Sequence, residues 1–179
     1  ANAGADQTLC SNNAVASLAG SFTITTGGVW SGGNGTFDPS TTNMNATYTP
    51  TAAEIATGNV TLTLTTTGNG SCNQVSDNIT LNFTPSPVVN AGAVVSLCAN
   101  NAVVSLNGSV SGATGGVWSG GAGSFTPNNT TLNATYTPTA GEIAAGTLTL
   151  TLTSTGNGNC NAVSASRVIT FTPAPVVNA

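Results

Sequence analysis

The chain has 179 residues, of which only 3% are charged, against about 25% in an ordinary soluble domain. Five acidic residues and a single cation, Arg167, give a net charge of -4, and histidine is missing. Phosphate binding needs several lysine or arginine side chains, so this composition excludes nucleic acid as a partner and disfavours anionic membranes. No apolar run approaches the roughly 20 residues that span a bilayer.

The sequence consists of two tandem repeats, offset by 88 positions and aligned without insertions. Of the 88 aligned positions 56 are identical, including both tryptophans, both tyrosines and all four cysteines. Self-similarity at a fixed period is typical of a repeat array. We expect one domain over residues 1–87 and a second over residues 88–179, in which Val177-Asn178-Ala179 starts a further repeat. The pattern predicts that the chain is a segment of a longer array.

Within one repeat, short apolar segments alternate with turn residues. The clearest segment is 60–65, where valine or leucine alternates with threonine, and it recurs at 148–153. Such alternation predicts an antiparallel strand with one buried face. Weaker segments of the same kind lie at 14–18, 29–30, 46–48 and 79–83. About seven short strands around one tryptophan predict an all-β fold of two tandem immunoglobulin-like β-sandwich domains.

The junction between the repeats, residues 84–90, contains two prolines within four positions. Proline restricts its own backbone and that of the preceding residue to extended conformations. The junction therefore predicts that the two domains form an extended rod.

One helical signal interrupts the strands of each repeat. Thr51 and Glu54 have the spacing of a capping box, in which each side chain binds a backbone N–H of the other residue. Gly58 suits the left-handed residue that ends a helix. Thr139 and Glu142 repeat the pair in the second copy. We therefore interpret the only acid common to both repeats as a helix cap.

The composition also argues against catalysis and bound cofactors. Nucleophilic catalysis lacks a histidine or lysine base, and the second repeat has no other acid to work with Glu142. A calcium site built from Asp6, Asp38 and Asp77 would be private to the first repeat, because the second repeat has Val94, Thr126 and Ala165 instead. We expect no catalytic residue, no cofactor and no metal site shared by the array.

Trp30, Trp118, Tyr48 and Tyr136 are the large aromatic residues of the two repeats. A lone tryptophan on a central strand is typical of a sandwich core, and we expect these four side chains to be core residues. The alternative is a sugar-stacking tryptophan, or a threonine face that presents ordered hydroxyls to glycan or ice.

Several motifs together resemble a known family. They are the opening at 2–10, the Gly-Gly-Val-Trp-Ser-Gly-Gly stretch at 27–33, Ala-Thr-Tyr-Thr-Pro at 46–50 and Gly-Asn-Gly-Ser-Cys at 68–72. Both copies resemble the tandem Ig-like or PKD-like repeats of giant cell-surface adhesins of Bacteroidota, some of which are gliding-motility adhesins exported by the type IX secretion system. The resemblance implies an extracellular, cell-surface location.

Two cysteines per repeat, without metal-type spacing, indicate disulfides in an oxidising compartment. Cys10 and Cys72 both lie outside the predicted strands, as do Cys98 and Cys160, and we expect all four in loops. If the two loops of a repeat lie at opposite ends, the bond joins Cys10 to Cys160 between domains. If the strand boundaries differ by a few residues, Cys10 pairs with Cys72 and Cys98 with Cys160.

Together these features predict a structural, non-catalytic repeat that forms the stalk or filament body of a large extracellular bacterial adhesin. The alternative is a glycan- or ice-binding module. Expected partners are neighbouring repeats of the same chain, laterally associated copies in filaments and surface glycans. Near-zero charge per repeat favours the lateral association, because self-repulsion is missing.

Overall fold

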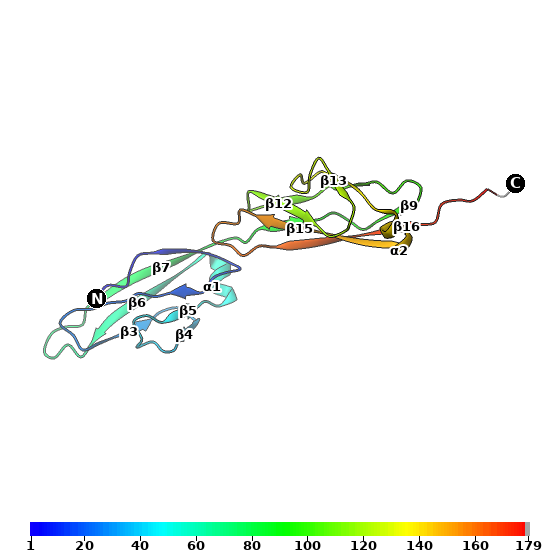
Figure 1. Ribbon diagram of the computed structural model, residues 1–179. Coiled ribbons are helices and arrows are strands. Elements are labelled where there is room, and N and C mark those ends of the chain that lie inside the picture. Colours follow the sequence, from blue (N-terminus) through cyan, green and yellow to red (C-terminus); the bar gives the residue numbers. More distant parts are fainter. Residues whose placement is uncertain (178–179) are drawn as a thin grey trace. The chain divides into compact units, whose positions relative to one another are not determined.

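The computed structural model describes residues 1–177, and Asn178 and Ala179 of the predicted third repeat lie outside the described residues. The chain divides into two compact units, Ala1–Ser86 and Pro87–Ala179. The boundary lies one residue before the position expected from the repeat. Each unit is an immunoglobulin-like β-sandwich, so the predicted all-β fold is confirmed (Figure 1).

In the first repeat, a four-stranded sheet has the order β1-β7-β6-β3 and a three-stranded sheet the order β2-β5-β4. The bounds are β1 Gln7–Cys10, β2 Ala16–Ser17, β3 Gly27–Ser31, β4 Thr36–Asp38, β5 Thr47–Thr49, α1 Ala52–Thr57, β6 Asn59–Thr67 and β7 Ser76–Thr84. Strands β6 and β7 form a long antiparallel hairpin, whereas β1 pairs with β7 in parallel.

The second repeat has the same two sheets, β12-β15-β16-β9 and β10-β14-β13, and an additional pair, β11-β8. The bounds are β8 Val88–Asn90, β9 Val95–Cys98, β10 Val104–Ser105, β11 Ser109–Ser111, β12 Gly115–Ser119, β13 Ser124–Thr126, β14 Thr135–Thr137, α2 Ala140–Ala145, β15 Thr147–Thr155 and β16 Ser164–Thr172. Described residues thus form seven strands in the first repeat and nine in the second, where about seven were expected. The first repeat has only the single bridge Asn2 to Ser21 where β8 and β11 pair.

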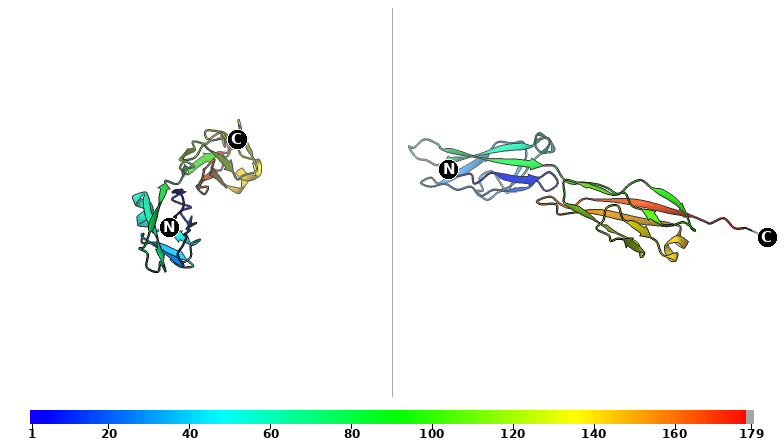
Figure 2. Two further views of the ribbon diagram at one scale, coloured as in Figure 1. Left: turned by 90° about the vertical axis from the view of Figure 1, so that its left-hand side faces the viewer. Right: turned by 90° about the horizontal axis from the view of Figure 1, so that it is seen from above.

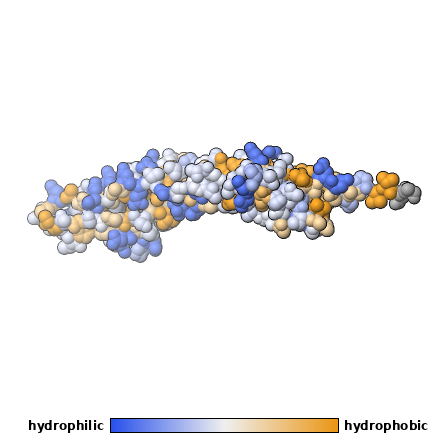
Figure 3. All heavy atoms as spheres, turned by 45° about the horizontal axis from the view of Figure 1, so that its top comes forward, coloured by the Kyte–Doolittle hydropathy of each residue, from blue (hydrophilic) through white to orange (hydrophobic). Residues whose placement is uncertain are grey.

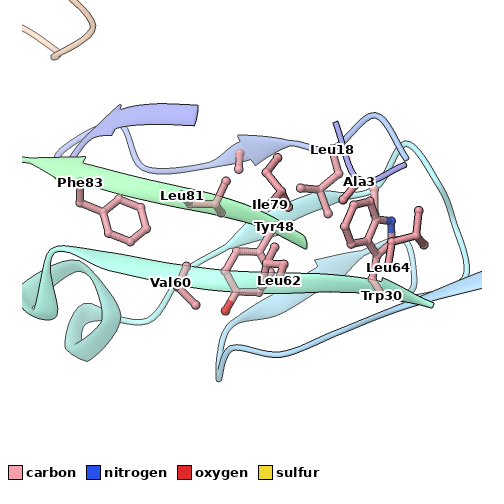
Figure 4. Close-up of a cluster of buried hydrophobic side chains, with 12 residues drawn as sticks. Ala3, Leu18, Trp30, Tyr48, Val60, Leu62, Leu64, Ile79, Leu81 and Phe83 are labelled. Carbon is pink, nitrogen blue, oxygen red and sulfur yellow. The ribbon is translucent and has the colours of Figure 1, made fainter. Parts of the chain in front are cut away.

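The alternation of threonine and aliphatic residues places one face of β6 in the core. Val60, Leu62 and Leu64 are buried, and the threonines between them lie on the outer face of the sheet. Strand β7 contributes Ile79, Leu81 and Phe83 to the same core. Figure 4 shows these side chains between the two sheets, with Trp30 at one end of the cluster and Phe83 at the other. The second repeat has an equivalent cluster around Trp118.

Each repeat receives and releases the chain at opposite ends. The backbone N–H of Ala3 donates to the Oδ2 of Asp77 at 2.8 Å, so the incoming chain lies beside the start of β7. Strand β7 then runs nine residues to Thr84, where the chain leaves. Figures 1 and 2 show the N-terminus near the β6–β7 loop, with α1 at the other end of the repeat. We call these two ends the incoming and the outgoing end.

The second repeat has the same polarity. Val88 pairs with Ser111, shortly before Gly115, which pairs with Thr155 at the loop end of β15. The incoming strand β8 therefore lies at the end that carries the β15–β16 loop. Strand β16 leads to Thr172 and Pro173 at the other end.

Arg167 occupies the position that the buried Ile79 has in the first repeat. Its Nη1 donates to the carbonyl oxygen of Ser105 at 2.9 Å, but its Nε is buried and has no hydrogen-bond partner within residues 1–177. A buried donor without a partner costs about 1–3 kcal/mol. The arginine at this position thus introduces a destabilising feature where the first repeat has an apolar side chain.

We predict that Arg167→Ile raises the free energy of unfolding of the second repeat by about 1 kcal/mol, because isoleucine fills the site without a polar atom. Urea unfolding followed by tryptophan fluorescence measures the change. The control is Val168→Thr, which gives the exposed neighbour of Arg167 the residue found at the equivalent position 80 of the first repeat, and it should change stability by less than about 0.5 kcal/mol. Lower stability of Arg167→Ile would contradict the prediction.

Candidate functional site

One hydrogen-bond network in each repeat joins three polar residues that both copies share, which are Tyr48, Thr51 and Glu54 in the first repeat and Tyr136, Thr139 and Glu142 in the second. In the first repeat the Tyr48 hydroxyl, from β5, donates to the Oε1 of Glu54 at 2.7 Å, and the N–H of Asn34 donates to the same oxygen at 2.7 Å. The N–H and the hydroxyl of Thr51 donate to Oε2 at 2.7 and 2.9 Å. Each carboxylate oxygen of Glu54 therefore accepts two hydrogen bonds.

The same carboxylate completes a capping box on α1. The side chain of Thr51 accepts from the N–H of Glu54 at 3.3 Å, while Glu54 binds the N–H of Thr51 in return. Gly58 ends the helix in the left-handed conformation, with φ of 89°. The helix, the turn before β4 and strand β5 are thus tied to a single carboxylate that is only 7% exposed.

The second repeat reproduces the network with nearly the same distances. Tyr136 donates to the Oε1 of Glu142 at 2.8 Å, and Ala122 donates its N–H to that oxygen at 2.7 Å. Thr139 provides the capping box, as Thr51 does in the first repeat. Position 34 is asparagine and position 122 is alanine, so this contact depends on the backbone and tolerates a change of side chain.

Two glycines before β4 make room for the tyrosine hydroxyl. The N–H of Gly35 donates to the Tyr48 hydroxyl at 2.8 Å, and a Cβ at Gly33, whose φ is +69°, would overlap that hydroxyl. Phe37 packs on the Tyr48 ring with a centroid distance of 4.8 Å. Gly121, Gly123 and Phe125 take these places in the second repeat.

The network lowers the pKa of Glu54 and of Glu142. Desolvation by burial is the largest single influence and acts to raise the pKa of Glu54. The N–H donors of Thr51 and Asn34, with the hydroxyls of Tyr48 and Thr51, together outweigh it, so the pKa of Glu54 lies below its ordinary value. A carboxylate that stays ionised and uses all its acceptor positions internally has no proton or free lone pair to offer a substrate. Its role in this geometry is to hold the turn, the helix and β5 together.

Two of the other three acidic residues also bind backbone groups. Asp6 accepts the N–H of Thr80 at 2.8 Å, and Asp77 accepts that of Ala3. Within residues 1–177, no three histidine, cysteine, aspartate or glutamate side chains lie close enough together to hold a metal ion. Neither helix in this part of the chain is long and apolar enough to cross a membrane.

Trp30 and Trp118 lie in the cores of their repeats, with 1% and 0% of their surface exposed. The alternative interpretation, in which they form sugar-stacking platforms, is therefore wrong, because neither ring can reach a ligand outside the sandwich. Tyr48 and Tyr136 are buried as well.

The outer face of β6 carries threonine hydroxyls in ordered cross-strand pairs. Thr63 donates to the Oδ1 of Asn78 at 2.8 Å, and the hydroxyls of Thr65 and Ser76 are 2.8 Å apart. Thr151 and Thr153 form the equivalent pairs with serines in the second repeat. These hydroxyls remain at the surface of a sheet, so they provide a polar face but no pocket. In Figure 3 the visible surface is largely of intermediate hydropathy, with scattered hydrophilic and hydrophobic residues.

The cysteines are in different chemical states. Cys10 and Cys160 are each disulfide-bonded, whereas Cys72 and Cys98 are free thiols. The alternative with both bonds inside repeats, Cys10 with Cys72 and Cys98 with Cys160, is therefore wrong. The expectation that Cys10 and Cys98 lie in loops is also wrong, because they are the last residues of β1 and β9. Cys10 is fully buried.

Sequence reasoning identified Glu54 as a cap and Tyr48 as a core residue but missed the bond between them. The signal that could have revealed it is their separation by six residues in both repeats, together with the glycines conserved between the copies at 33 and 35. It was missed because the side-chain contact depends on how the turn before β4 folds back over β5.

No protein family with a defined sequence profile matches this chain, and no curated protein does. Similar solved structures include the insect immune protein hemolin, with 12% identity and a TM-score of 0.48 over 96% of this chain and 46% of hemolin. The extracellular cadherin domains 1–4 of protocadherin gamma B7 have 10% identity and a TM-score of 0.43, over 94% and 49% of the two chains. Drosophila N-cadherin EC1-4 has 12% identity and a TM-score of 0.41, over 93% and 47%. The chain spans about half of the length of these structures, and its fold assignment rests on its own strand pairing.

We predict that the two tyrosines of the chain titrate near pH 12. Burial and the hydrogen bond to the glutamate raise the pKa of Tyr48 and of Tyr136 to about 12. Stability from the neutral hydroxyls is present below about pH 10 and is lost as the pH rises toward 12, so ionisation should accompany unfolding. Absorbance at 295 nm and circular dichroism report the two events. The control is the same titration in urea, where the midpoint should be near 10; a midpoint near 10 in the folded chain would contradict the network.

We also predict that Glu54→Gln and Glu142→Gln each lower the free energy of unfolding at pH 7 by about 1–3 kcal/mol, because the amide NH₂ group faces N–H and hydroxyl donors. The ionised carboxylates stabilise the fold above their ordinary pKa of about 4.3, and this contribution is lost as the pH falls through the lower folded values. Denaturant unfolding at pH 7 and pH 3 should therefore show the wild type and the variants converging in acid. An equal difference at both pH values would refute this.

Proposed function

We propose that the chain is a structural repeat unit of the stalk or filament body of a large extracellular adhesin, acting as a spacer and not as a catalyst. The observation that carries this proposal is the polarity of the repeat. In both copies the chain arrives beside the loop end of the last two long strands and leaves at the other end of the last strand. Copies joined in this way add length with each repeat.

The residues shared by the two repeats support a structural role. The paired tryptophans and tyrosines fill the cores, and the paired glutamates bind backbone groups and hydroxyls within their own repeat. These shared side chains keep two small sheets, a turn and a short helix in register.

An extracellular, cell-surface location is supported by the oxidised Cys10 and Cys160, since disulfides persist outside reducing compartments. The resemblance to tandem repeats of Bacteroidota surface adhesins leads us to propose that source class, including the gliding-motility type. Extended rods and lateral association into filaments belong to the same proposal, because almost no charge separates neighbouring copies.

A second candidate function is glycan or ice binding by the threonine face. The paired hydroxyls of β6 and β7, repeated on β15 and β16, favour it because they form regular rows on a twisted but open sheet surface. These hydroxyls form hydrogen bonds with side chains of the neighbouring strand, however, so the rows also stabilise the sheet itself.

We predict that the repeats act as a spacer whose length increases with repeat number and that they bind no ligand of their own. Cells that display a single-domain antibody on two, four or eight repeats should capture antigen-coated beads through an increasingly thick polymer layer as repeats are added. The isolated chain should be blank on a glycan array and in an ice-recrystallisation assay. Light scattering of the same arrays at high concentration reports lateral association.

The matched variants are Thr63→Lys and Thr151→Lys, which place a charge on the outer face of each repeat without touching the core. The spacer should keep its reach in these variants. If the wild-type chain binds glycan or ice and both variants lose this binding, glycan or ice binding replaces the spacer role as the proposed function. The proposal would be overturned if the polymer thickness through which beads are captured did not change with repeat number.

A further inference from the structure

The four cysteines occupy two kinds of position, and each kind is bonded in one repeat and free in the other. Cys10 and Cys98 are equivalent, as are Cys72 and Cys160. Cys10 is bonded and Cys98 is free, whereas Cys160 is bonded and Cys72 is free. A position that forms a disulfide in one copy is competent to form one in the other, so the two thiols are candidates for the same bond with a different partner.

The two positions lie at opposite ends of a repeat. Cys10 is opposite Thr84, the last residue of β7, and its Sγ is 3.9 Å from the carbonyl oxygen of Pro85. Cys72 lies in the β6–β7 loop, four residues before β7 begins at Ser76. The eight residue steps of β7 from Ser76 to Thr84 cover about 27 Å. A disulfide needs Cα atoms within about 7 Å, so a bond inside the repeat is excluded by the length of β7.

The second repeat has the same arrangement. Cys98 is opposite Thr172, and its Sγ is 3.9 Å from the carbonyl oxygen of Pro173, where the chain leaves. Cys160 lies in the β15–β16 loop, which is at the incoming end. Every repeat therefore carries one cysteine at its outgoing end and one at its incoming end. Covalent connection through Ser86 and Pro87 makes the outgoing end of one repeat the neighbour in sequence of the incoming end of the next.

We propose that the disulfides of this chain connect consecutive repeats. Cys10 at the outgoing end of the first repeat is joined to Cys160 at the incoming end of the second. Cys98 forms the same bond with the incoming-end cysteine of a following repeat, and Cys72 with the outgoing-end cysteine of a preceding one. Each bond forms from two thiols, and their two protons and two electrons pass to a small-molecule or protein disulfide, which is reduced to two thiols.

A hollow beside Cys98 supports a following repeat as the partner. It has a volume of about 560 Å³, and its lining includes Ala99, Ile143, Ala144, Phe171 and Pro173. Pro173 belongs to the segment that leaves the repeat, and Val176 shortly after it is 84% exposed. The occupant we assign is the incoming end of the next repeat, because the departing chain holds that end within a few residues of the hollow.

The first test is peptide mapping of the chain under non-reducing conditions, with free thiols alkylated before proteolysis. We expect one linked pair, Cys10 with Cys160, and alkylated Cys72 and Cys98. A peptide that links Cys10 to Cys72 or Cys98 to Cys160 would overturn the proposal.

The second test uses an in-register tandem, in which Val176 of one copy is joined to Ala1 of the next, oxidised with glutathione disulfide. One chain has two free thiols, and the tandem should also have two, because Cys98 of the first copy and Cys72 of the second are joined. Maleimide labelling with mass spectrometry counts them. Cys98→Ser in the first copy is the control and should give three thiols.

Four free thiols in the tandem would overturn the proposed link between repeats. That result would leave the spacer function intact, since a spacer can be held by its backbone alone. The inference rests on the proposed function only in assuming that repeats follow one another, and the bead-capture experiment tests that function independently of the thiol count.

Discussion

The length and direction of the last strand in each repeat determine the rest of the structure. Strand β7 runs from the loop end, where Asp77 binds the incoming chain, to Thr84, where the chain leaves. The short edge strand β1 pairs with it in parallel and brings Cys10 to the outgoing end. The antiparallel partner β6 places the loop with Cys72 at the incoming end. One strand thus separates the two cysteines and gives the repeat its polarity.

The buried glutamate solves the second structural problem, which is to hold three very short elements against this long hairpin. Strands β4 and β5 have three residues each and α1 has six, too few for independent stability. The Glu54 carboxylate connects α1, β5 and the turn before β4 through four hydrogen bonds. In a chain with so few charges, four of the five acidic side chains bind groups of their own repeat.

The all-β sandwich could be predicted because the alternating segments at 60–65 and 79–83 are long and regular. The capping motifs could be read because Thr51 and Glu54 are close in sequence. The sequence did not allow prediction of strand β1 or of the pair β8 and β11. These strands have only three or four residues and depend on pairing with distant strands. That is also why Cys10 was expected in a loop. The contact of Tyr48 with Glu54 depends on a turn whose path the sequence pattern does not specify.

The central claim is that each repeat passes the chain from one end to the other, so that repeats extend an array. Small-angle X-ray scattering of the chain and of its in-register tandem tests this most directly. For an extending array, doubling the number of repeats should nearly double the radius of gyration. A compact arrangement would raise the radius of gyration only about 1.3-fold, because it scales with roughly the 0.38 power of length, and that result would contradict the account.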